Sequence, residues 1–274
     1  LTSPDAVTWT RLPIPAANGL NAIGYGAGRY VAIGDQGYIT TSLDAATWVG
    51  NTTASGTTQS LRGIAYANGR WIVVGAGGVI RTSINGTTWT TVTSPVTTNF
   101  NALTTFGSTF IAIGDSGVIR TSTDGTTWTA ATSGTTQALR GICVDRGTAY
   151  IVGSNRTILA STDAQTWTTR TAPAANNSTT YRGITAANGG LFIVGEQGVA
   201  LFSPDSVKWT YLPNLAYRET LYAVASNGLS TVIVASGGTI LQAGNPTVLP
   251  SRLVNVATRG LVQPGGNLTP GFVL

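Results

Sequence analysis

The sequence lacks the residues on which many hydrolases and metalloenzymes depend. Its 274 residues include no histidine, no methionine, one cysteine (Cys143) and one lysine (Lys208). Without histidine the chain cannot build a Ser-His-Asp triad, a Cys-His pair or an imidazole metal site. One cysteine allows neither an internal disulfide nor a thiolate zinc cluster. We therefore predict no catalytic residues, no metal and no cofactor. We expect Cys143 to be a buried structural thiol and Lys208 to be solvated.

Charge is also scarce. Asp, Glu, Lys and Arg together make up 9% of the chain, against roughly 25% in an ordinary soluble domain. The net charge is +5, but the arginines are scattered, which argues against a nucleic-acid partner. No apolar run approaches the roughly 18 residues of a membrane span, so we predict no membrane insertion. The surface, rich in Thr, Ser, Asn and Gly, favours an extracellular or cell-surface bacterial protein that forms part of a longer secreted chain.

A heptapeptide that ends in tryptophan recurs six times. The spacings between successive tryptophans are 39, 41, 39, 39 and 42 residues. The third and last positions of the repeat are Asp5 and Trp9, Asp44 and Trp48, Asn85 and Trp89, Asp124 and Trp128, Asp163 and Trp167, and Asp205 and Trp209. An Asp or Asn in a tight turn accepts backbone N–H groups, and a tryptophan can pack between neighbouring units. We therefore interpret these twelve residues as structural.

Each repeat reads as four short strands. In the second unit the strands are expected at 61–66, 70–74, 79–83 and 89–92, with the hairpin dipeptide Asn68-Gly69 after the first. The sixth unit supplies three strands, at 221–226, 231–235 and 239–242, and lacks the heptapeptide. The missing piece stands at the other end of the chain, in residues 1–12. Antiparallel units with a period of about 40 residues predict propeller blades.

The predicted fold is thus all-β: a six-bladed β-propeller of four-stranded antiparallel blades in residues 1–244. We expect residues 8–12 to pair as the outermost strand beside 239–242 and so to close the ring. A linear β-solenoid is the alternative, but it does not explain why the two ends carry complementary parts of one unit. Residues 245–274 are expected to form a C-terminal β tail that begins a further module or linker.

The heptapeptide resembles the turn of the Asp-box, or BNR, repeat family, as in Ser122-Thr-Asp-Gly-Thr-Thr-Trp128. The turn here is one residue shorter than that family's Ser-x-Asp-x-Gly-x-Thr-Trp. The whole unit is closer to photosystem II assembly-factor-like and bacterial surface-protein propellers, and more distantly similar to sialidases. The resemblance covers residues 1–243. It implies a β-propeller but says little about function, because one fold hosts many activities.

In propellers the first strand of each blade lines the central channel, and its start shares a face with the turn between strands two and three. Aligning the units places two sets of polar residues there. The strand starts are Asn21, Arg62, Asn101, Arg140, Arg182 and Tyr222, and the acidic turn positions are Asp35, Asp115 and Glu196. The structural interpretation is that the acids neutralise the arginines. The functional interpretation is an arginine-bearing funnel that binds a glycan, a peptide carboxylate or another anion.

Four functions remain open at this point. The leading one is a non-catalytic, secreted or cell-surface binding or scaffolding module for a glycan, a protein or another anionic ligand. A sialidase-like glycosidase would use the same arginines, but the sequence has no Arg-Ile-Pro motif. An assembly factor for a membrane complex would use an arginine patch on one face. Finally, residues 251–274 could add as a strand to a neighbouring subunit, so that the protein self-associates into an extracellular polymer.

Overall fold

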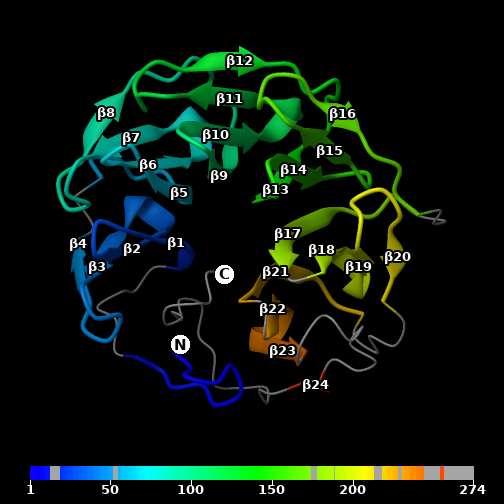
Figure 1. Ribbon diagram of the computed structural model, residues 1–274. Helices are drawn as coiled ribbons and strands as arrows, with labels where there is room; N and C mark the ends of the chain where they lie inside the picture. The colour runs from blue at the N-terminus through cyan, green and yellow to red at the C-terminus, as the bar shows by residue number, and fades with distance from the viewer. Residues whose placement is uncertain are drawn as a thin grey trace.

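The protein is an all-β propeller of six four-stranded antiparallel blades arranged in a ring (Figure 1). The computed structural model describes residues 1–12, 19–51, 55–173, 178–187, 189–212, 218–227, 230–243 and 254–255. Within these ranges the only helical segments are five three-residue 3-10 turns between the second and third strands. No helix in the described ranges is long and apolar enough to cross a membrane.

The four strands of each blade follow one another in sequence from the channel outward. The innermost strands are β1 Leu20–Gly26, β5 Leu61–Ala67, β9 Phe100–Phe106, β13 Leu139–Asp145, β17 Tyr181–Ala187 and β21 Leu221–Ser226. The second strands are β2 Arg29–Gly34, β6 Arg70–Gly75, β10 Thr109–Gly114, β14 Thr148–Gly153, β18 Gly190–Gly195 and β22 Thr231–Ala235.

The outer strands are shorter. The third strands are β3 Ile39–Ser42, β7 Ile80–Ser83, β11 Ile119–Ser122, β15 Ile158–Ser161, β19 Ala200–Ser203 and β23 Thr239–Ala243. The fourth strands are β4 Val49–Asn51, β8 Thr90–Val92, β12 Thr129–Ala131, β16 Thr168–Thr169, β20 Thr210–Tyr211 and β24 Val254–Asn255. The 3-10 turns are η1 Asp35–Gly37, η2 Ala76–Gly78, η3 Asp115–Gly117, η4 Glu196–Gly198 and η5 Ser236–Gly238.

The core lies between blades rather than within a single sheet. The cluster between the second and third blades joins Ile72 and Val74 of β6 to Phe100 of β9 and Phe110 of β10. Similar clusters join the first blade to the second, the third to the fourth, the fourth to the fifth and the fifth to the sixth, because both faces of a blade are apolar and each must be covered by a neighbour. These five junctions are thus held together by apolar burial.

The heptapeptide turns lie at the outer end of these junctions. In each of the six, the third residue accepts the backbone N–H groups of the residues two and three positions on, as Asp124 Oδ1 does from Thr126 and Thr127 at 2.7 Å each. Asn85 makes the same two bonds at 2.9 Å. Every tryptophan of the repeat belongs to, or packs against, an apolar cluster. The turn therefore fixes the outer strand and supplies a large side chain to the junction.

The last blade differs from the expected arrangement. Strand β23 pairs with β24, with Leu241 opposite Asn255 and Gln242 opposite Val254. Its fourth strand therefore comes from the C-terminal side of the chain, and the prediction that residues 8–12 pair there is wrong. The rest of the predicted C-terminal tail, residues 245–253 and 256–274, lies outside the described residues.

The N-terminal segment packs beside the last blade instead. It is held by an isolated bridge between Thr2 and Thr10, and Ala6 is fully buried against Val232 and Ile240. In the third blade, Gly125 at the equivalent turn position lies against Ile72 of the preceding blade's second strand. Residues 3–9 thus occupy, against the second strand of the sixth blade, the position that the next blade's heptapeptide turn occupies at other junctions. Leu12 then packs against the first blade, so the segment closes the ring by side-chain packing.

Candidate functional site

A β-bulge starts every innermost strand and positions the candidate residues. In each blade the first residue of the strand pairs with the last residue of the second strand, and the pairing then skips one residue. The skipped residues are Asn21, Arg62, Asn101, Arg140, Arg182 and Tyr222. A bulge re-aims the side chain of its extra residue. All six predicted strand-start positions are therefore released from the sheet pairing at one face of the ring.

A glycine lies opposite this bulge in the first five blades, and Ala235 lies opposite it in the sixth. The residue opposite the strand start is Gly34, Gly75, Gly114, Gly153 or Gly195. A Cβ on Gly114 would lie 2.1 Å from the carbonyl oxygen of Asn99, which is closer than non-bonded atoms can approach. That carbonyl accepts the N–H of Asp115 at 3.0 Å and so fixes the turn that carries the acid.

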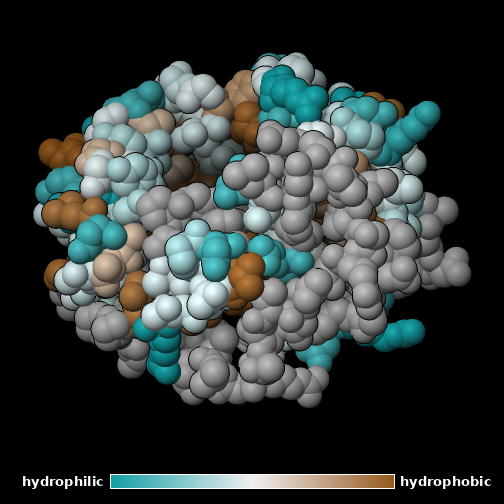
Figure 2. All heavy atoms as spheres, turned by 60° about the horizontal axis from the view of Figure 1, so that its bottom comes forward, coloured by the Kyte–Doolittle hydropathy of each residue, from teal (hydrophilic) through white to brown (hydrophobic). Residues whose placement is uncertain are grey.

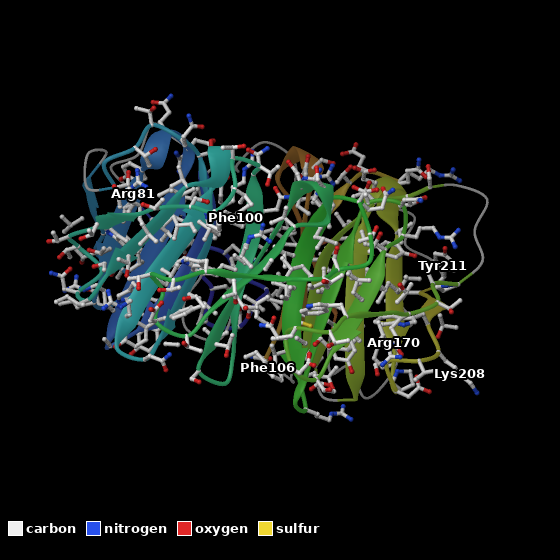
Figure 3. The ribbon with its side chains drawn as sticks, turned by 90° about the horizontal axis from the view of Figure 1, so that it is seen from above. Arg81, Phe100, Phe106, Arg170, Lys208 and Tyr211 are labelled. Atoms are coloured by element: carbon white, nitrogen blue, oxygen red, sulfur yellow. The ribbon has the colours of Figure 1, made fainter. Side chains whose placement is uncertain are left out.

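The two faces of the ring carry different elements. Figure 3 shows β9 running from Phe100 at the upper face to Phe106 at the lower face. Strand starts and 3-10 turns lie at the Phe100 end, whereas the inner hairpins lie at the Phe106 end and Lys208, in a heptapeptide turn, is exposed near that lower face. The strand starts and the turns between strands two and three thus share one face, as predicted.

A polar cavity of about 460 Å³ lies at the upper face, at the channel entrance. Seven of the nine candidate residues line it together with Ser60: Asn21, Asp35, Arg62, Asn101, Arg140, Arg182 and Tyr222. The other two, Asp115 and Glu196, each form an ion pair with an arginine of the lining. The structure thus brings all nine together. We call this cavity, with its two supporting acids, the entrance site.

Asp115 is the most densely bonded acid of the entrance site. Asn101 donates to Oδ1 at 2.8 Å, Asn99 donates to Oδ2 at 2.9 Å, and Arg140 Nη1 lies 3.5 Å from Oδ1. Partial burial alone would raise the pKa of Asp115, but the two amide donors and the charges of Arg140 and Arg62 outweigh it and lower that pKa. Asp115 is therefore ionised at neutral pH and holds Arg140 in place.

Arg182 and Glu196 form a second pair, within the fifth blade. Arg182 Nη2 lies 2.5 Å from Glu196 Oε1. Burial alone would raise the pKa of Glu196. The hydrogen bond and the charge of Arg182 outweigh burial, so the pKa is lowered from its ordinary value. The guanidinium carbon of Arg182 also lies 5.6 Å from the centre of the Tyr222 ring, a cation–π distance. The ring of Tyr222, 51% exposed, is thus held at the rim of the cavity.

Arg62 is bonded differently from Arg140. Its Nη1 donates to Asn101 Oδ1 at 3.0 Å, in the next blade. Among the described residues it forms no ion pair, and neither does Asp35, whose Oδ1 accepts Asn21 Nδ2 at 3.0 Å. The expectation that the ring neutralises itself thus fits Arg140 and Arg182 but not Arg62. A guanidinium and a carboxylate that form hydrogen bonds but no ion pair therefore lie in the lining of one cavity.

The sequence alignment missed three features of this site. Asn99 and Ser60 precede the innermost strands and were not aligned as functional positions, although Asn99 completes the shell of Asp115. The bulge was not anticipated, although the recurring Gly opposite the strand start in the first five blades is its signal. Bonds between blades, such as Asn21 Nδ2 to the carbonyl of Leu61 at 3.0 Å, could not be read from one repeat at a time.

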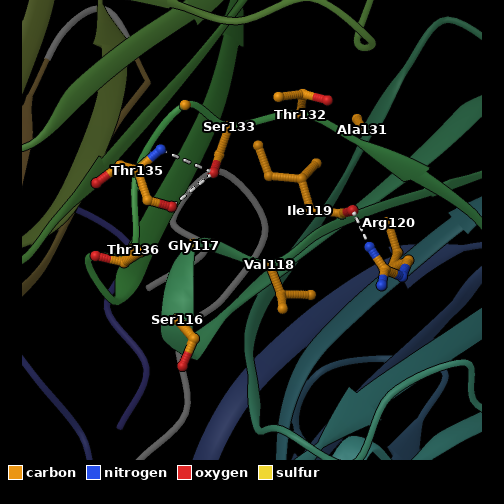
Figure 4. Close-up of a pocket in the computed structure, with 11 residues that line it drawn as sticks. Ser116, Gly117, Val118, Ile119, Arg120, Ala131, Thr132, Ser133, Thr135 and Thr136 are labelled. Atoms are coloured by element: carbon orange, nitrogen blue, oxygen red, sulfur yellow. Dashed lines mark hydrogen bonds between the residues drawn. The ribbon is translucent and has the colours of Figure 1, made fainter.

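The remaining surface offers less. A second, more open groove of about 670 Å³ runs along the third blade between β11 and the 131–136 connection, where Ser133 bonds to Thr135 (Figure 4). Its lining combines Ser and Thr hydroxyls with apolar side chains such as Val118 and Ile119, and Arg120 is its one charged residue. Figure 2 shows apolar residues spread among polar ones on the face in view. In the described ranges no group of three or more Cys, Asp or Glu residues could hold a metal ion.

Solved structures match this chain over most of its length, whereas no protein-family model and no curated protein matches it. YCF48 from Cyanidioschyzon merolae matches with a TM-score of 0.73 and 14% identity, over 92% of this chain and 90% of that one. A structure of YCF48 bound to D1 peptide gives 0.71 and 14%, over 89% and 86%.

Virginiamycin B lyase from Staphylococcus aureus gives a TM-score of 0.77 and 12% identity, over 95% of this chain and 92% of that chain. At such identities the likeness shows the fold alone. The neighbours include both a lyase and a protein seen with a bound peptide, so the fold is compatible with either kind of activity.

Proposed function

We propose that this protein is a non-catalytic binding module that holds an anionic segment of a partner protein at the entrance site. The observation that carries the proposal is the convergence of three arginines from three blades on one cavity, where Arg62 forms no ion pair with any described residue. Guanidinium groups bind carboxylates through charge-assisted, often bidentate hydrogen bonds.

The partner is proposed to be a protein on two grounds. The lining of the cavity includes Tyr222, which offers an exposed ring of the kind enriched in protein interfaces. A propeller of the same fold has been seen with a bound peptide. We also propose that the protein acts at a cell surface or outside the cell, on the compositional grounds given above.

A peptide-binding measurement tests the proposal. The probe is a fluorescent, terminally blocked hexapeptide of alternating Ala and Asp, and the matched peptide carries Asn in place of Asp. We expect the Asp peptide to bind, and both Arg62→Gln and Arg182→Gln to weaken it about tenfold. Arg146→Gln is the control, because Arg146 is an exposed arginine at the hairpin end of β13, on the opposite face.

The proposal fails if the Asn peptide binds as well as the Asp peptide, or if the Arg62 and Arg182 variants behave like the Arg146 variant. A sialidase assay on the unmodified protein tests the catalytic alternative. Turnover that is lost in Arg62→Gln would replace the binding module with a glycosidase.

A further inference from the structure

The first two blades repeat the layout of the third and fourth, which allows a residue-by-residue comparison. Asp35 and Asp115 occupy the same turn position, since each donates its N–H to the carbonyl before the innermost strand, Gly19 O at 2.9 Å and Asn99 O at 3.0 Å. Arg62 and Arg140 occupy the same bulge position in the following blade. The two Asp–Arg pairs therefore have equivalent backbones.

In the third and fourth blades this pair is closed. Arg140 reaches back to Asp115 Oδ1 at 3.5 Å, and the side chain of Asn99 occupies Oδ2 at 2.9 Å. Both oxygens of Asp115 and the cation of Arg140 thus have partners within the protein. The carboxylate of Asp115 is thus fully engaged within the protein, and Arg140 is tied to it by one ion pair.

In the first and second blades the equivalent pair is open. Gly19 stands where Asn99 stands, and a Cβ on Gly19 would lie 2.9 Å from Asp35 Oδ2. That carboxylate oxygen therefore faces the space that the glycine leaves. Arg62 turns away from Asp35 and bonds to Asn101 instead. A carboxylate and a guanidinium that would otherwise pair are held apart in the lining of the same cavity.

We infer that the gap between Asp35 and Arg62 binds a group with both charges: a cation at Asp35 and a carboxylate beside it at Arg62. In a protein partner this group is a basic and an acidic side chain next to each other. Such a ligand replaces the missing Asp–Arg contact with two charge-assisted contacts in a half-buried setting, where each is stronger than in water. The inference rests on the proposed function and adds the requirement for a cation.

Three blocked peptides separate the charges. The first contains Lys-Asp flanked by alanines, the second has Ala in place of Lys, and the third has Ala in place of Asp. We expect the Lys-Asp peptide to bind about tenfold more tightly than the Ala-Asp peptide by isothermal titration calorimetry. Asp35→Asn should abolish that tenfold difference. Arg62→Gln should weaken both peptides.

Gly19→Asn provides a second, independent variant. It gives the first blade the residue of the third, so its amide would occupy Asp35 Oδ2 as Asn99 occupies Asp115 Oδ2. Because the close atom is the end of a side chain, a small shift accommodates the new Cβ. We expect this variant, like Asp35→Asn, to lose the preference for the Lys-Asp peptide while its melting temperature stays near that of the unmodified protein.

The outcomes distinguish the inference from the proposed function. If the Ala-Asp peptide binds in an Arg62-dependent way and Lys adds nothing, the inference is wrong and the proposed function stands. The same absence of a Lys effect is expected if Arg62 forms an ion pair with Asp35 in the bound state. If none of the peptides binds, both are overturned. A Lys-Asp preference that survives both Asp35→Asn and Gly19→Asn overturns the inference alone.

Discussion

Asn101 and Asp115 are bonded at 2.8 Å within one blade, and Asn101 links that blade to both of its neighbours. Its amide nitrogen also donates to the carbonyl of Leu139 at 2.9 Å, and its oxygen accepts Arg62 at 3.0 Å. One side chain thus connects three blades at the channel entrance. Its neighbour Arg140 makes a single longer contact to the same acid.

The first prediction follows from this difference. Asn101→Ala should lower the free energy of unfolding by about 1–3 kcal/mol, because it leaves Asp115 and Arg62 with unmade hydrogen bonds in a half-buried site. Arg140→Gln should cost only about 0–1 kcal/mol, because its ion pair is about one-third exposed and screened by water. Urea unfolding of both variants checks the order. An equal or larger loss in Arg140→Gln would contradict it.

The second prediction concerns the bulges. Gly114→Ala should lower the free energy of unfolding by about 1–3 kcal/mol, since the new Cβ would meet a backbone oxygen that cannot move without displacing the turn. Gly141→Ala is a useful comparison, because its nearest neighbour would lie at 2.9 Å rather than 2.1 Å. In thermal unfolding, the melting temperature of Gly114→Ala should be lower than that of Gly141→Ala. The reverse ranking would mean that the strand start can shift freely.

The third prediction is a loss of stability in acid. Backbone N–H groups donate to Asp5 and Asp163 and lower the pKa of each acid from 3.8 to about 2. The largest cause is the N–H of Thr8 for Asp5 and the N–H of Thr166 for Asp163. A folded-state pKa below the unfolded one stabilises the fold above the unfolded value and loses that contribution as pH falls. The melting temperature should therefore fall between about pH 4 and pH 2.

Asn85 supplies the control for that prediction, because it shows that an amide keeps both turn hydrogen bonds. Asp163→Asn should therefore fold normally and show a shallower loss of melting temperature between pH 4 and pH 2. An identical pH profile for this variant and the unmodified protein would exclude Asp163 as a source of the acid sensitivity.

The fourth prediction concerns the N-terminal segment. Removing residues 1–12 should lower the free energy of unfolding by about 2–5 kcal/mol, because it uncovers Val232 and Ile240 and removes the buried Ala6. Ala6→Asp tests the same packing with a single substitution and should also destabilise the fold. Val7→Asp is the matched control, since Val7 is 47% exposed in the same turn. An unchanged melting temperature after the deletion would show that the segment does not close the ring.

The sequence predicted the blades well because turn residues mark the ends of the strands in each repeat. Two strands of the sixth unit, Leu221–Ser226 and Thr231–Ala235, begin and end where expected, since the hydrophobic alternation and the flanking turns agree. The pairing of β24 with β23 was missed because the tail has no repeat to be aligned with. Residues 1–12 were assigned to the wrong position because the heptapeptide predicts a type of turn but does not predict which blade the turn packs against.

For the entrance site, the sequence predicted which residues meet but not how they bond. Alignment brought Arg62 and Arg140 to equivalent positions, and the structure agrees. Their different partners depend on residues outside the aligned positions: Asn99 completes the shell of Asp115, whereas Gly19 leaves Asp35 open. Such differences arise from contacts between units and are not contained in the repeat pattern.

The bulge at each strand start separates two kinds of selection on the sequence. The residue before it, such as Leu61 or Phe100, is fully buried and constrained by the core, whereas the bulged residue is not paired in the sheet. Substitutions at a bulge leave the apolar clusters between blades in place, although they can remove polar bonds such as those of Asn101. A duplicated blade brings one further side chain of this kind to the channel mouth, so the polar lining can change while the apolar junctions stay the same.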